Sequence, residues 1–194
     1  MSIRTIGIAR HGKTRLNEEN KIRSWIDIPL NAEGVEEARR LGEELRVSAD
    51  LWDGIVSSDL VRSVQTSVEI SAIANIPILE LNEAFRPINV GSLSGADGEL
   101  ANSIIMDHAI NTPGKPIGGG ESFNTFKRRV LLGLKEAIQR YADRRIIIST
   151  HTRCERLFNA WAKTNFSREF EIDILEFGQL GIGTATIQTL EIRI

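Results

Sequence analysis

Residues 3–12 read IRTIGIARHG: a short apolar run leads straight into an arginine, a histidine and a glycine. Such a run, rich in β-branched residues and ended by an abrupt change of polarity, predicts a buried strand over Ile3–Ala9. Residues 145–151 read RIIISTH and repeat the pattern, so a second buried strand is predicted just before His151. Because ligands bind at the carboxyl ends of parallel strands in α/β sheets, we expect His11 and His151 to share one site.

Strand and helix patterns alternate along the rest of the chain. Helical spacing and capping residues predict helices at 31–47, from the Ser57-Ser58-Asp59 caps to about Ala72, near 98–110, after Ser122 and after Thr152. Further strands are predicted at 54–56 and 76–79, with one or two more in 171–193. This order predicts an α/β fold, a three-layer sandwich whose mostly parallel central sheet has helices on both faces.

The chain length suits one domain. With 194 residues, we expect a single domain over residues 1–194. Residues 82–120 are the least regular part, because glycines and prolines interrupt them. We expect this stretch to be a small insertion that caps the active site.

Composition narrows the class of protein. The formal net charge is −2, so no overall positive field would recruit nucleic acid or an anionic membrane surface. Cys154 is the single cysteine, which excludes an intrachain disulfide and a cysteine zinc cluster. No apolar run approaches the roughly 20 residues of a membrane span, and no signal-peptide pattern is present. We therefore expect a cytoplasmic protein with no nucleic-acid or membrane partner.

Two histidines and two arginines stand at or near predicted strand ends. Arg10 and His11 follow the first strand, Arg62 lies about one helical turn beyond the strand at 54–56, and His151 follows the apolar run at 146–148. Guanidinium groups match phosphate oxygens in bidentate geometry, and an imidazole is a competent nucleophile toward phosphorus. Each residue alone could be structural, but their joint position at strand ends predicts phosphoryl chemistry.

Other reactive side chains fit structural roles better. Cys154 lies on the apolar stripe of its predicted helix, which favours core packing over catalysis. His108 lies in the irregular segment with no charged motif around it. Trp25 is expected to pack, or to line the rim of the cleft.

The chain resembles the histidine phosphatase superfamily, in its phosphoglycerate-mutase-like branch. Five ordered blocks carry the resemblance: RHGKTRLN at 10–17, DIPLNAEG at 27–34, SSDLVRS at 57–63, GGES at 119–122 with Arg129 on the next helix, and STH at 149–151. A lone Arg-His-Gly would be a weak signal, whereas five blocks in the expected order are specific.

The resemblance implies roles for the matching residues. His11 would be the nucleophile that becomes phosphohistidine, and water would then cleave the intermediate. The phosphoryl group would be held by Arg10, Arg62, His151 and Asn17, with a further donor from the backbone N–H of Thr152 at a helix start. No metal and no cofactor would be required, because the arginines supply the positive charge.

Two positions depart from the family pattern: Thr152, where many relatives have glycine, and the position of the general acid. Members often carry a glutamate general acid in Leu-Arg-Glu-x-x-x-Gly, whereas residues 85–91 here read FRPINVG. Pro87 occupies the acid position and cannot donate a proton. Glu83, Asp97 and Glu99 are the weak candidates for a substitute, and the sequence does not choose among them. General acid catalysis typically contributes about 10²–10⁴-fold, so poor leaving groups would suffer most from its loss.

These patterns predict a metal-independent phosphatase that hydrolyses phosphomonoesters through phosphohistidine. Phosphoglycerate-mutase-type transfer is the less favoured alternative, because the short insertion suggests an open site. A non-catalytic binder of phosphorylated ligands is a second alternative, and a phosphatase of protein phosphohistidine is a third. The expected partner is a phosphorylated small molecule or phosphoprotein, and the resemblance makes a homodimer possible.

Overall fold

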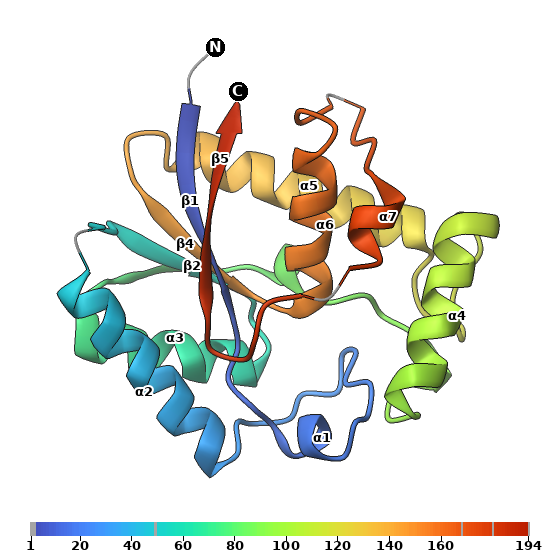
Figure 1. Cartoon of the computed structure of the whole chain (residues 1–194), viewed down its shortest axis with the longest axis horizontal. Coiled ribbons are helices and arrows are strands. Elements are labelled where there is room, and N and C mark those ends of the chain that lie inside the picture. The colour runs from blue at the N-terminus through green and yellow to red at the C-terminus, as the bar shows by residue number, and fades with distance from the viewer. Residues whose placement is uncertain (1–2, 49, 168, 180, 194) are drawn as a thin grey trace.

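The computed structural model describes residues 3–48, 50–167, 169–179 and 181–193 (Figure 1). Its strands are β1 (Ile3–Arg10), β2 (Gly54–Ser57), β3 (Ile78–Leu81), β4 (Ile146–Thr150) and β5 (Ile187–Arg193). Its α-helices are α1 (Arg15–Glu18), α2 (Ala32–Val47), α3 (Val61–Ala74), α4 (Gly98–Asn111), α5 (Phe123–Arg140), α6 (Thr152–Ala162) and α7 (Ile174–Phe177). Two 3₁₀ helices, η1 (Glu83–Phe85) and η2 (Gly91–Leu93), lie between β3 and α4.

The strands form one sheet in the order β3-β2-β4-β1-β5. The pairs β2–β3, β2–β4 and β1–β4 are parallel, and β5 is antiparallel to β1 at the edge. The two histidine-bearing strands are direct neighbours, because Arg10 pairs with Thr150 in the β1–β4 register. The mostly parallel sheet expected from the sequence is therefore confirmed.

Alternate side chains of the central strands pack on opposite faces of the sheet. Ile146 and Ile148 of β4 join an apolar cluster with residues of α5 and α6, whereas Ile147 joins a second cluster with residues of α2 and α3. Figure 1 shows the same arrangement, with α2 and α3 on one side of the sheet and α5 and α6 on the other. Burial of such apolar faces stabilises the sandwich by roughly 25 cal/mol per Å² removed from water. The three-layer architecture is confirmed.

Two of the predicted helix caps act as predicted. Asn31 accepts a hydrogen bond from the Gly34 amide at the start of α2, and Ser122 accepts one from the Thr125 amide at the start of α5. Each bond satisfies an amide that the first turn of a helix leaves without a partner.

The cap predicted for α3 is wrong. The helix begins at Val61, after Leu60, rather than directly after Ser57–Asp59. The polar side chains of that segment are used elsewhere: Ser58 bonds His151, and Asp59 pairs with Arg86.

Two other boundaries also differ from the prediction. The third strand runs over Ile78–Leu81 rather than 76–79. Pro77 has no amide hydrogen to donate to a neighbouring strand, although its carbonyl accepts from the Ile55 amide. The tail forms a single strand, β5, preceded by the short helix α7, which alternation alone did not predict. Within the described part of the chain, none of the helices combines the length and apolar character of a membrane span.

Candidate active site

The carboxyl ends of three neighbouring strands deliver the site residues. The His11 amide donates to the Thr150 carbonyl (3.1 Å), so the β1–β4 pairing continues one residue beyond β1. The Ser58 amide donates to the Ser149 carbonyl (2.8 Å) in the same way. Backbone hydrogen bonds therefore fix the segments that carry His11, Ser58 and His151 relative to one another.

A cavity of about 340 Å³ opens at this edge of the sheet, a size usual for a small-molecule site. It is lined by Arg10, His11, Asn17, Asn20, Ile22, Arg23, Ser24, Arg62, Pro87, Ile88, Asn102, His151, Thr152, Arg153, Arg156 and Gly181. Five of these residues are arginines and two are histidines, whereas none of the described lining residues is Asp or Glu. The cavity is thus suited to an anion.

The ring of His11 is held in one tautomer. Its Nδ1 lies 2.7 Å from the carbonyl oxygen of Gly12, and because a carbonyl can only accept, Nδ1 must carry the proton. The lone pair of a neutral ring is then on Nε2, as nucleophilic attack requires. A side chain at Gly12 would meet the backbone oxygen of Gly34 at 2.3 Å, so this turn requires glycine.

The second imidazole lies close to the first. The ring centroids of His11 and His151 are 5.1 Å apart. His151 Nε2 is 2.9 Å from the Ser58 hydroxyl, and its buried Nδ1 has no hydrogen-bond partner in the described part of the chain. If the Ser58 hydroxyl donates to Nε2, then Nδ1–H of His151 remains available to a ligand.

Both imidazoles have strongly lowered pKa values. Burial is the largest cause, since it disfavours the charged ring, and repulsion from the Arg62 guanidinium lowers the pKa of each histidine further. Both rings are therefore neutral near pH 7 while the cavity holds no anion, which keeps the His11 lone pair available.

The two predicted phosphate-binding arginines are anchored by backbone carbonyls. Arg62 is completely buried and donates to the carbonyls of Ile26 (2.8 Å) and Ser24 (2.9 Å). Arg10 donates to the Ile182 carbonyl (2.6 Å). In both residues the buried Nε has no partner within the described residues. Burying a donor without a partner is costly, so the two guanidiniums are prepared for an anionic ligand.

The remaining predicted binding residues also line the cavity. Asn17 accepts hydrogen bonds at Oδ1 from the amide (3.1 Å) and the hydroxyl (2.8 Å) of Thr14. These contacts fix the orientation of the side chain and leave its NH₂ group for a ligand. Thr152 is the first residue of α6, where backbone amides lack helical acceptors.

None of the three substitute acids lies in the cavity lining. The Glu83 side chain is 76% exposed and faces Arg86. Asp97 caps α4 by accepting from the amides of Glu99 and Leu100, and Glu99 itself is exposed. Pro87, by contrast, is buried and lines the cavity. The structure thus places no carboxyl group from these candidates near the histidines.

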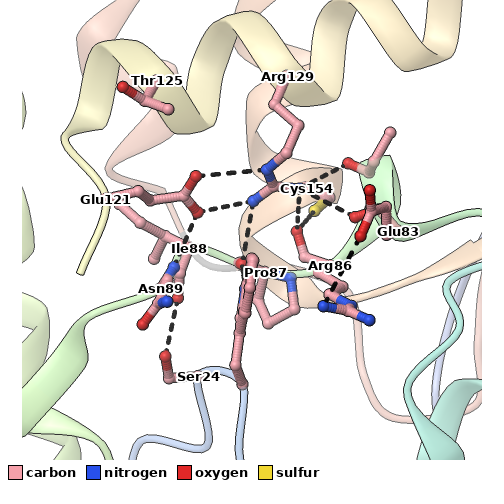
Figure 2. Close-up of polar contacts among 12 residues, drawn as sticks. Ser24, Glu83, Arg86, Pro87, Ile88, Asn89, Glu121, Thr125, Arg129 and Cys154 are labelled. Carbon is pink, nitrogen blue, oxygen red and sulfur yellow. Dashed lines mark hydrogen bonds and ion pairs between the residues drawn. The ribbon is translucent and has the colours of Figure 1, made fainter.

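Arg129 holds the segment that contains Pro87 (Figure 2). It extends from α5 and donates to the carbonyls of Ala84 (2.8 Å), Arg86 (3.1 Å), Glu83 (3.2 Å) and Pro87 (3.3 Å). Glu121 binds the same guanidinium at 2.6 Å and accepts from the Asn89 amide at 2.8 Å. Arg129 and Glu121, which the sequence marked as a family block, therefore act as a clamp on residues 83–89.

Trp25 and Cys154 support the same segment. The Trp25 indole donates to the Pro87 carbonyl (2.8 Å), and the Arg86 guanidinium lies 4.8 Å from the centre of its ring. The thiol of Cys154 donates to the carbonyls of Arg86 (3.3 Å) and Phe85 (3.5 Å). Burial raises the pKa of Cys154 to about 12, so its thiol is not a nucleophile at neutral pH.

Sequence reasoning missed three arginines and a carboxyl group. Arg153 and Arg156 belong to the first turns of α6 and line the cavity, as does Arg23. The buried Glu155 lies behind the lining, where a side chain at Gly181 would meet its Oε2. The arginines two and five residues after His151 were a usable signal, because the helix start brings them to the same edge. Nothing in the sequence around Arg23 marked it.

The comparisons with known proteins agree with this geometry. The family described as "Histidine phosphatase superfamily (branch 1)" matches residues 6–192. The "Uncharacterized phosphatase PhoE" of Bacillus subtilis (strain 168) is 29% identical over 144 residues, which cover 74% of this chain and 69% of that protein.

Two further proteins show the range of the relatives. The "Metal-independent phosphoserine phosphatase" of Arabidopsis thaliana is 31% identical over 157 residues, or 75% of this chain and 63% of that protein. A crystal structure of phosphoglycerate mutase from Bacillus anthracis str. Sterne has a TM-score of 0.78 at 18% identity, covering 99% of this chain and 89% of that one. That likeness supports the fold.

Proposed function

The chain belongs to the histidine phosphatase superfamily, branch 1, and from this premise we propose that it hydrolyses phosphomonoesters through a phosphohistidine formed on His11. The observation that carries the proposal is the state of His11: Nδ1 is held on the Gly12 carbonyl, which leaves the Nε2 lone pair free. Its lowered pKa keeps the ring neutral and nucleophilic at neutral pH.

In the first step, Nε2 of His11 attacks the phosphorus atom and the bond to the leaving-group oxygen breaks. Arg10 and Arg62 hold the phosphoryl oxygens, because each keeps an unpartnered buried N–H beside the histidines. The NH₂ group of Asn17 and the backbone N–H of Thr152 add neutral donors. Fixed donors of this kind stabilise the charge that develops in a phosphoryl transition state.

In the second step, water attacks the phosphohistidine and the P–N bond breaks. His11 recovers its lone pair, and the oxygen and both protons of the water leave with the product phosphate. His151 donates from Nδ1 to a phosphoryl oxygen in both steps, while Ser58 holds Nε2. The charges for these steps come from the arginines, so the proposed reaction is metal-independent.

Residues 82–120 are proposed to cap this site within a single domain. Pro87 and Ile88 come from the start of the segment, Asn102 comes from α4, and all three line the cavity. These side chains face the group attached to the phosphate, so they would contribute to the choice of a phosphorylated small molecule over a larger phosphoprotein.

The proposal is tested by trapping the intermediate. A ³²P-labelled phosphomonoester is mixed with the enzyme and quenched in alkali, which preserves phosphohistidine. We expect label on wild type and none on His11→Ala, together with loss of turnover in the variant. Arg128→Met, an exposed change on α5, is the matched control. Absence of both label and turnover in wild type would overturn catalysis and leave a binder of phosphorylated ligands.

A further inference from the structure

The cavity contains more positive charge than one phosphoryl group needs. Beyond Arg10 and Arg62, its lining includes Arg153, Arg156 and Arg23. Arg153 is 7% exposed, and its buried Nη1 has no hydrogen-bond partner in the described part of the chain, while Nη2 donates to Asn102 of α4. A buried guanidinium with an unpartnered N–H points to an anionic ligand.

The positive charges of the lining act on one another as well as on the histidines. Besides burial, the charges that lower the pKa of His11 are those of Arg62, Arg23 and Arg10. Burial lowers the pKa of Arg153 to about 9, and the charges of Arg156 and Arg23 lower it further. The charge of Arg23 thus acts on both His11 and Arg153, and the charge of Arg156 also acts on Arg10. A ligand that spans the cavity would meet positive charge at two adjacent places.

We infer that Arg153 and Arg23 form a second phosphate subsite beside His11, and that among phosphorylated substrates the site prefers a terminal phosphoanhydride, whose leaving group is itself a phosphate, to a phosphomonoester. The inference rests on the proposed function, since it assigns the group that departs when His11 is phosphorylated.

The chemistry of the cavity favours an anhydride over an alkyl ester. None of the described lining residues carries a carboxyl group. The resembled family pattern often has a glutamate general acid at the position that Pro87 occupies here. An alkoxide leaving group needs a proton in the transition state, whereas a phosphate departs as a stable anion. Positive charge at Arg153 would therefore replace proton donation.

The step balances without a further reactant. Nε2 of His11 forms a bond to the terminal phosphorus, and the bond from that phosphorus to the bridging oxygen breaks. The electron pair stays on the bridging oxygen, so the leaving phosphate departs as an anion held by Arg153 and Arg23. Water then cleaves the phosphohistidine as described above and returns His11 to its starting form.

The test compares two substrates on one α6 variant and a matched control. Turnover of inorganic pyrophosphate and of phenyl phosphate is measured with EDTA present for wild type, Arg153→Met and Arg128→Met. We expect Arg153→Met to lower kcat/KM for pyrophosphate about 10- to 100-fold, the value of a charge-assisted contact, and that for phenyl phosphate less than about 3-fold. Arg128→Met, an exposed change on α5 outside the cavity lining, should leave turnover of both substrates within about 3-fold of wild type.

The outcomes separate this inference from the proposed function. Cleavage of phenyl phosphate with pyrophosphate as the poorer substrate, or equal losses on both substrates in Arg153→Met, would overturn the second subsite and leave the phosphatase intact. A preference for a carboxylate-bearing ester such as phosphoglycolate over pyrophosphate would overturn the anhydride. If Arg153→Met does not fold, Arg153→Lys gives the same comparison, with a partial loss on pyrophosphate expected. No cleavage of either substrate by wild type, and no phosphohistidine, would remove the proposed function itself.

Discussion

The clamp formed by Arg129 and Glu121 makes a quantitative prediction about stability. Arg129→Met removes a guanidinium that serves four backbone carbonyls and leaves the Glu121 carboxylate, only 10% exposed, without its ion-pair partner. Breaking a buried pair on one side costs about 3–5 kcal/mol, because a charge stays buried without compensation. For a chain of this size each kcal/mol lowers Tm by about 2–4 °C, so we expect a fall of about 6–20 °C.

A double-mutant cycle separates the ion pair from the carbonyl contacts. Glu121→Gln keeps an acceptor for the Asn89 amide but removes the charge, so the double variant should be more stable than the sum of the single losses predicts. We expect a coupling energy of about 1–3 kcal/mol between the two positions. Arg128→Met, one residue away and exposed, should stay within about 0.5 kcal/mol of wild type.

The assay is urea denaturation followed by far-UV circular dichroism, with steady-state kinetics on the same samples. Because Pro87 and Ile88 line the cavity, loosening of residues 83–89 should also raise KM for an aryl phosphate. A loss below about 1 kcal/mol in Arg129→Met, or strictly additive single losses, would refute the view that this clamp holds the segment in place.

Four further predictions concern the pH dependence, the cavity lining and the buried thiol. Because the pKa of His11 lies well below its usual value, the acid limb of kcat/KM, corrected for ionisation of the substrate, should lie below about pH 6.5. The free energy of unfolding should fall as the pH drops below about 6.5, because the unfolded chain binds protons that the buried His11 and His151 do not bind. An acid limb above that pH, or a free energy of unfolding in urea that does not change with pH, would contradict this. Asn17→Asp adds a negative charge to the lining and should raise KM about 10- to 100-fold, and an unchanged KM would remove Asn17 from the binding set. The Cys154 thiol should resist iodoacetamide at neutral pH until the protein is denatured, as labelling followed by mass spectrometry would report.

The sequence carried enough information for the architecture because the decisive strands are uniformly apolar. The run at 146–148 has a face on each side of the sheet, and a central strand covered by helices on both sides buries both faces. The predicted helix boundaries were less accurate where a polar side chain contacts a distant part of the chain instead of capping a helix. Ser58 looked like a helix cap, but its hydroxyl contacts His151, a choice that depends on a partner 93 residues away in the chain.

The site was predictable where it depends on strand ends and obscure where it depends on loops. Arg10 and His11 follow β1 directly, so their position is fixed by the sheet. Arg23 lies in the connection between α1 and α2, and its place in the lining depends on a path that no periodicity encodes. Asp97 illustrates the reverse error: a carboxylate before Gly-Glu-Leu at the start of a predicted helix is a helix cap, and it serves as one here.

Pro87 and the arginines of the lining bear on one property of the cavity, which is how it would treat a leaving group. Pro87 lines the cavity and has no proton to donate, and the five arginines of the lining supply fixed positive charge. The protein as a whole has a formal charge of −2, yet the described lining has five guanidiniums and no carboxylate, with Glu155 behind it as a partial counter-charge to Arg10. One phosphoryl dianion cannot neutralise that set, whereas a ligand with two adjacent phosphates comes closer. A cavity that stabilises a departing group by charge has no need of an acid to protonate it, provided that the group leaves as an anion. Pro87 and the arginines would therefore act together. The positive field inside the cavity would favour substrates whose leaving group departs as an anion.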